Sequence, residues 1–156
     1  MKQKKISKWL KAIAYFLVIV GTLFVIGVSI YAFMSPEKHP VGSILGFPLF
    51  TWYTIIFCYI ILFQFWKVAT EIGNDNSFSP ENAKSFHNMF IAGIFLAVGF
   101  IAKFCLLLFA NNLGLIYGMF IVLEIIGSIV LTVLCEALSK LIQNAYEIKQ
   151  ENELTI

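Results

Sequence analysis

The C-terminal third of the chain, residues 113–156, reads LGLIYGMFIVLEIIGSIVLTVLCEALSKLIQNAYEIKQENELTI. Its first half, residues 115–134, is apolar apart from one acid, Glu124, and is long enough to cross the hydrocarbon core of a bilayer. No Pro or Gly follows this run, so the helix is expected to continue as a polar, amphipathic segment over residues 136–150. The segment therefore predicts one long helix that crosses a membrane and emerges from it.

Apolar residues recur along the emerging part of this helix at spacings of four, three, four and three. They form an apolar seam made of Leu134, Leu138, Leu141, Ala145 and Ile148. Such spacing lines one face of a helix, as in a coiled coil. Two interpretations stay open: the seam packs on the inner ends of the second and third spans or on residues 67–88, or it docks a partner protein.

The composition places the whole chain in a membrane. Hydrophobic residues make up 60% of the 156 residues and charged residues only 13%, against about 25% in soluble proteins. A soluble domain of this size could not bury that much apolar surface, so lipid must be the solvent for most of it. The net charge is +2 and every basic residue is Lys. Direct nucleic acid binding is therefore not expected.

Three further apolar runs precede the last one. The predicted spans cover about residues 12–33, 48–66, 89–110 and 115–134, and they form a single membrane domain over residues 1–156. Ser79 and Pro80 are typical of the start of a helix, which should run without a break into the third span. Residues 111–114 predict a tight turn, so spans three and four should form an antiparallel hairpin. The expected fold is an all-α integral membrane four-helix bundle with the fourth helix extended.

The lysines predict the orientation of these spans. With the N-terminus inside, nine lysines face the cytoplasm and one, Lys38, lies outside; the nine are Lys2, Lys4, Lys5, Lys8, Lys11, Lys67, Lys84, Lys140 and Lys149. Cytoplasmic loops of membrane proteins carry such an excess of Lys. We therefore expect a multi-pass protein of the cell membrane with both termini and the extended fourth helix in the cytoplasm.

Two ionisable side chains, Lys103 and Glu124, fall within predicted spans. Each costs about 2.5–3.5 kcal/mol near a helix centre, so each should have a partner. Their distances from the turn at residues 111–114 place them at similar depths on neighbouring antiparallel helices. They either form a salt bridge that fixes the register of the hairpin, or Glu124 is a proton or cation site in a small transporter.

Motifs for catalysis or metal binding are not found in the sequence. It has no Gly-rich phosphate loop, no His-Glu-x-x-His and no Gly-x-Ser-x-Gly. The three cysteines, Cys58, Cys105 and Cys135, form no Cys-x-x-Cys pair, and His39 and His87 are interpreted as a loop residue and an interfacial residue. We expect no enzyme activity, and no catalytic, cofactor-binding or metal site.

Two stretches resemble a known family. They are Asn76-Ser77-Phe78-Ser79-Pro80-Glu81-Asn82 and the C-terminal segment 143–156, which closes with Glu-Asn-Glu-Leu-Thr-Ile. Both are similar to small bacterial membrane proteins known only as domain of unknown function "twenty-nine seventy-five" (DUF2975). The resemblance covers nearly the whole chain and implies a four-helix membrane unit, often encoded beside a very small Cro-like helix-turn-helix regulator. It implies no catalytic or binding residues.

The leading hypothesis is a non-enzymatic regulatory or sensory membrane protein whose partner is a small cytoplasmic helix-turn-helix regulator. The alternative is a small transporter, or a toxin or bacteriocin immunity protein, that uses Glu124. A third hypothesis is a structural accessory subunit. Four spans make a narrow bundle, which also leaves room for a homodimer.

Overall fold

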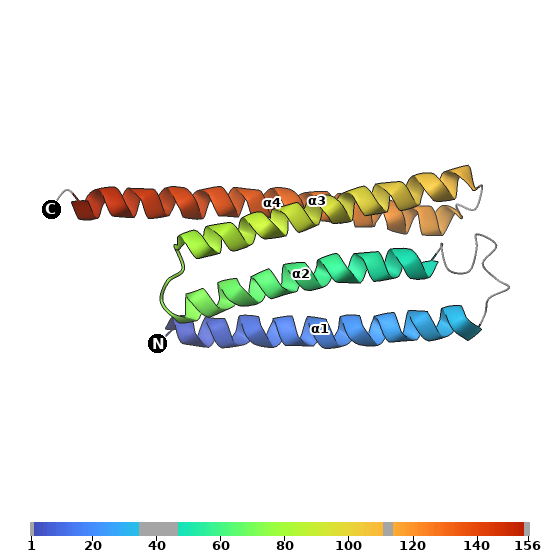
Figure 1. Ribbon diagram of the computed structural model, residues 1–156, viewed down its shortest axis with the longest axis horizontal. Coiled ribbons are helices and arrows are strands. Elements are labelled where there is room, and N and C mark those ends of the chain that lie inside the picture. Colours follow the sequence, from blue (N-terminus) through green and yellow to red (C-terminus); the bar gives the residue numbers. More distant parts are fainter. Residues whose placement is uncertain (1, 35–46, 111–113, 155–156) are drawn as a thin grey trace.

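The computed structural model describes residues 2–34, 47–110 and 114–154. These residues form four helices, α1 (Lys2–Met34), α2 (Phe47–Gly73), α3 (Pro80–Phe109) and α4 (Leu115–Leu154). Each is long and apolar enough to cross a membrane. The helices lie along one common direction, and both termini are at the same end of the molecule (Figure 1). The predicted all-α architecture with four spans is therefore confirmed.

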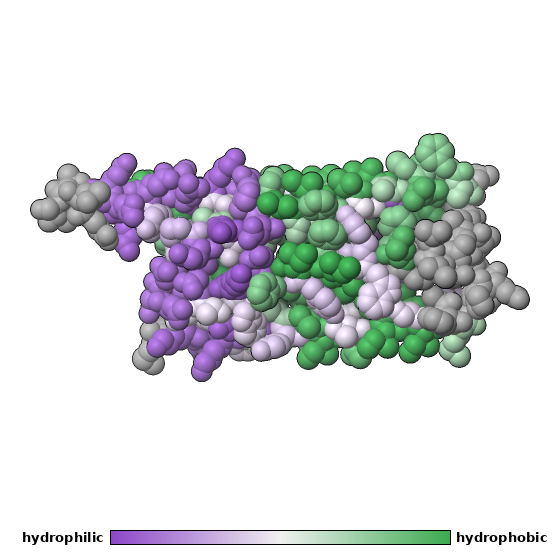
Figure 2. Space-filling model, viewed as in Figure 1, coloured by the Kyte–Doolittle hydropathy of each residue, from purple (hydrophilic) through white to green (hydrophobic). Residues whose placement is uncertain are grey.

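The helices are longer than the predicted spans at the end that carries both termini. There α1 already begins within the lysine-rich N-terminal segment, α2 continues to Gly73, and α3 begins at Pro80. α4 continues farthest and extends past the ends of its neighbours (Figure 1). Hydrophilic residues cluster at this end, which we call the polar end, while much of the remaining visible surface is hydrophobic (Figure 2).

A fixed turn joins α2 to α3 at the polar end. Asp75 adopts a left-handed conformation with φ 59°, which Asp tolerates better than most residues. The Ser79 side chain caps α3 by accepting a hydrogen bond from the Asn82 backbone N–H at 3.2 Å, and Pro80 begins the helix. The side-chain amide of Asn82 donates to the carbonyl of Ser77 at 2.9 Å. The predicted start of the third helix is confirmed, and it continues without a break to Phe109.

Small residues allow α3 and α4 to pack closely. A Cβ atom added at Gly93 would collide with the side chain of Thr132. The hydroxyl of Ser139 donates to the carbonyl of Ala83 at 2.7 Å, so a second contact joins the two helices nearer the polar end. Such contacts of small and hydroxyl side chains are typical of helix pairs in membranes. Residues 111–113 of the predicted connecting turn lie outside the described residues.

The helices pack mainly on their neighbours in the sequence, so α1 and α4 form the two edges of the assembly. The Ser7 hydroxyl joins α1 to α2 by donating to the carbonyl of Ala69 at 2.5 Å. The Tyr53 hydroxyl joins α2 to α3 by donating to the carbonyl of Phe95 at 2.6 Å. A small hydrophobic core of Val68, Met89 and Cys135 links α2, α3 and α4.

Candidate functional site

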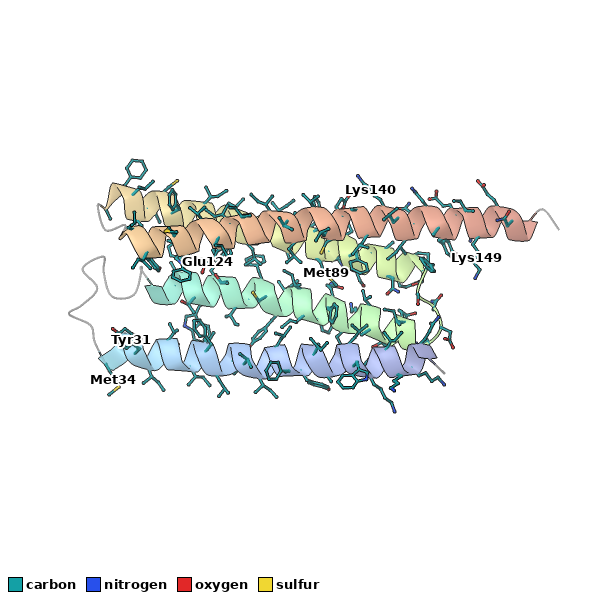
Figure 3. The ribbon with its side chains drawn as sticks, turned by 180° about the vertical axis from the view of Figure 1, so that it is seen from behind. Tyr31, Met34, Met89, Glu124, Lys140 and Lys149 are labelled. Atoms are coloured by element: carbon teal, nitrogen blue, oxygen red, sulfur yellow. The ribbon has the colours of Figure 1, made fainter. Side chains whose placement is uncertain are left out.

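The two intramembrane charges lie together across the α3–α4 contact. Lys103 Nζ is 3.4 Å from Glu124 Oε2, and it also lies 5.3 Å from the centre of the Tyr117 ring. The Lys103 side chain is 13% exposed, whereas that of Glu124 is 44% exposed. Figure 3 shows Glu124 in the apolar half of α4, far from Lys140 and Lys149 on the same helix.

This geometry is that of a charge-assisted hydrogen bond between two helices. An ammonium and a carboxylate at this distance offset part of each other's cost in an apolar surrounding. The pair connects the last two turns of α3 to the first quarter of α4. Either side chain would lose its partner if one helix slid along the other. The arrangement can hold the register of the hairpin without any bound ion.

The face of α4 that contacts α3 is a second regular row rather than the apolar seam. Its buried members are spaced by four, three, four and three residues; they are Ser128, Thr132, Cys135, Ser139 and Ile142. Most of these side chains are small, and a small side chain lets two helix backbones come close. The regular spacing of these small residues is visible in the sequence. It was missed because the larger apolar residues of the seam give the stronger hydrophobic pattern.

The apolar seam is the outward face of the same helix. Leu141 is 64% exposed and Ile148 is 60% exposed, and Leu134 and Leu138 are exposed as well, while Ala145 is partly exposed. Much of the apolar surface of the seam is therefore exposed on the described part of the chain. Beyond Leu134 it lies in the polar end, where Leu138 and Leu141 flank Ser139, which is hydrogen-bonded to α3. The last turns of α4 extend past the other helices (Figure 1).

A second charged cluster joins α3 and α4 at the polar end. His87 Nδ1 is 3.0 Å from Glu136 Oε2, and Lys140 Nζ is 3.4 Å from Glu136 Oε1. The hydrogen bond with His87 is the main reason why the pKa of Glu136 lies below its usual value of 4.5. The cluster borders an open cleft of about 640 Å³ between the two helices. The link between Glu136 and His87 was not predicted, because the two residues are distant in the sequence.

The described residues give no sign of a metal centre. Among them, no three His, Cys, Asp or Glu side chains lie together as metal ligands would. Cys58, Cys105 and Cys135 are all free thiols. His39 lies outside the described residues.

Comparison with known proteins places the chain in a family. Neither the curated proteins nor the solved structures contain a match to it. One family model matches residues 47–156, which is well over half of the chain and includes α2, α3 and α4. Both stretches that carried the resemblance fall within this region. The chain therefore belongs to the family described as Protein of unknown function (DUF2975).

Proposed function

We propose that this protein is a non-enzymatic membrane regulator that binds a cytoplasmic protein through the apolar seam of α4. The partner that suits it best is a small helix-turn-helix regulator, which the seam holds at the membrane. The proposal includes the orientation expected from the lysines, in which the polar end faces the cytoplasm.

The observation that carries the proposal is the exposure of the seam where α4 leaves the apolar region. Leu138, Leu141 and Ile148 present large apolar side chains on a helix whose opposite face already packs on α3. An amphipathic helix with apolar residues at this spacing is a common docking element, because its face fits a groove or another helix. Contiguous exposed apolar surface in water also favours association.

Two features support the choice of a helix-turn-helix partner. Members of the family resembled by this sequence are often encoded beside such a regulator. In addition, the docking helix is continuous with a span, so a regulator bound to it would be kept at the membrane and away from DNA. A sequestered regulator needs no catalytic site in the membrane protein.

A small transporter or immunity protein centred on Glu124 is the alternative. The partial exposure of this carboxylate is the observation that supports it. Lys103 weighs against it, because an acid that exchanges protons or cations should not be held by a fixed ammonium at 3.4 Å. Loss of proton-coupled flux in Glu124→Gln vesicles, with folding intact, would favour this alternative.

The proposal is tested by co-purification with a helix-turn-helix regulator of the kind encoded beside genes of this family. Leu141→Glu puts a charge on the seam, where the side chain is exposed and folding should be unaffected. Gln150→Glu adds the same charge to α4 on a different face and is the matched control. We expect the regulator to co-purify with the wild type and the control but to be lost, by at least about tenfold, with Leu141→Glu. Equal retention by both variants, or by a 1–135 truncation that still inserts, would rule out the seam as the docking face.

A further inference from the structure

A polar cleft of about 390 Å³ lies between α2 and α3 at the polar end. Its walls include two lysines and two glutamates, Lys67, Lys84, Glu71 and Glu81, together with the amides of Gln64 and Asn88. The volume is in the range of small-molecule sites, which is about 300–1,000 Å³. The two positive and two negative charges give the cleft a net charge of zero.

The four charged side chains are not paired with one another. The ion pairs of Lys103, His87 and Lys140 with their glutamates all lie outside this cleft. Lys67 Nζ lies 4.7 Å from the centre of the Phe63 ring. Glu71 Oε2 accepts a hydrogen bond at 3.1 Å from the side-chain amide of Asn76. Cationic and anionic groups are therefore both available to a ligand that carries both charges.

Gln64 supplies a further polar group. Its Oε1 atom is buried and accepts no hydrogen bond from the described residues, although nearly all buried polar atoms in proteins have a partner. The residue lines the cleft. A ligand with N–H donors could satisfy this atom after a small rotation of the side chain.

Exposed apolar side chains follow the cleft in the direction of the membrane on both α2 and α3. Ile60 and Phe63 lie one helical turn before Gln64 and Lys67 on α2, and both are exposed. Ile91 and Phe95 follow Asn88 on the corresponding side of α3 and are exposed too. The surface along the two helices is thus polar at the cleft and apolar nearer the membrane, which matches the two parts of an amphiphilic ligand.

The depth of the cleft matches that of lipid headgroups. Trp66, at the end of the second predicted span, is part of its wall, and Trp prefers the boundary between hydrocarbon and water. Lys67 and Lys84 stand just outside the second and third predicted spans, where a lysine can reach a phosphate.

We propose that this cleft binds the headgroup of a phospholipid with a primary ammonium, of which phosphatidylethanolamine is the common example. Lys67 and Lys84 bind the phosphate, while Glu71, Glu81 and Gln64 Oε1 accept hydrogen bonds from the ammonium. The acyl chains lie along the exposed side chains of Ile60 and Ile91. An anionic lipid would satisfy the lysines but would offer no ammonium to the two carboxylates. This site is separate from the seam on α4 and does not depend on it.

The test is a lipid titration of the full-length protein, followed by native mass spectrometry. Phosphatidylethanolamine should bind roughly tenfold more tightly than phosphatidylcholine, whose trimethylated nitrogen has no N–H to donate. Lys67→Gln combined with Lys84→Gln should weaken phosphatidylethanolamine binding by a similar factor. Gln64→Leu should reduce the preference over phosphatidylcholine, because one of the three acceptors for the ammonium is lost. Lys140→Gln, an exposed lysine on α4 outside the cleft, is the matched control.

Three results would overturn the proposal. Equal affinity for phosphatidylethanolamine and phosphatidylcholine would show that the ammonium is not recognised. Tighter binding of the anionic phosphatidylglycerol would show that only the lysines act. Displacement of the lipid by an equal concentration of glycerophosphoethanolamine, which lacks acyl chains, would show that the acyl chains do not contribute to binding. The ligand would then be a soluble molecule. Circular dichroism of each variant establishes that the helices are retained.

Discussion

Lys103 and Glu124 define the chemistry of the membrane interior in this protein. Their 3.4 Å contact uses the one acid of the α4 span and a lysine of α3. The lysine is the more buried of the two, which gives the ammonium a fixed place beside Tyr117 and leaves the carboxylate partly exposed. Since each charge is the other's partner, the pair stabilises the α3–α4 hairpin in one register.

Glu136 makes the polar contact of α3 and α4 sensitive to acid. Its pKa is lowered by His87, so the folded state favours the charged carboxylate. The stabilisation is complete above the ordinary pKa of 4.5 and is lost as the pH falls through the lowered pKa of the folded protein. Hydrogen exchange of the α3 amides near His87 should therefore accelerate in wild-type protein as the pH falls below the lowered pKa of Glu136.

The matched variants separate this effect from general acid unfolding. Glu136→Gln should remove the acid-dependent acceleration, because no carboxylate remains to be protonated. Glu147→Gln, on the same helix but without a hydrogen bond to His87, should keep it. An identical pH response in wild-type protein and Glu136→Gln would show that the His87 contact does not control the opening of this region.

At the scale of elements, the α3–α4 contact depends on the absence of a side chain at Gly93. A methyl group there would collide with Thr132, whereas a methyl group at Gly127 on the outer face of α4 would meet nothing within 4 Å. Gly93→Ala should lower the free energy of unfolding by about 1–3 kcal/mol. Gly127→Ala should be neutral or stabilise the helix by up to about 1 kcal/mol. Unfolding in detergent measures both, and equal stabilities would contradict the close packing.

The course of α4 was predictable because its periodicity is continuous and no Pro or Gly follows Leu134. The start of α3 was predictable for a local reason as well, since Ser79 and Pro80 have specific roles at a helix N-terminus. The face that α4 presents to α3 was not predicted. Within the span, lipid solvates the larger apolar residues, so small residues such as Thr132, which packs against Gly93, make the contact.

The contact between His87 and Glu136, two positions distant in the sequence, could not be predicted either. His87 and Glu136 are separated by 49 residues, and their meeting depends on the rotation of α3 relative to α4. Lys103 and Glu124 could be matched because a short predicted turn fixes their depths. The cleft between α2 and α3 has no local sequence signal, since its lysines and glutamates resemble any solvated helix surface.

At the scale of the whole molecule, the four helices combine an apolar region with one polar end that carries both termini (Figure 2). At this end α4 carries a row of exposed large apolar side chains, Leu138, Leu141 and Ile148. In the proposed orientation that face is in the cytoplasm. The proposed function requires that α4 crosses the membrane and presents Leu141 outward on the cytoplasmic side.

Cysteine labelling tests this claim most directly. In a variant without Cys58, Cys105 and Cys135, a single cysteine is placed at exposed Leu141 (Leu141→Cys) or at buried Ser139 (Ser139→Cys). A membrane-impermeant maleimide should label Leu141→Cys rapidly in inside-out vesicles and not in intact cells, and should label Ser139→Cys slowly in both. Faster labelling at residue 139 than at residue 141, or labelling of residue 141 in intact cells, would contradict the account.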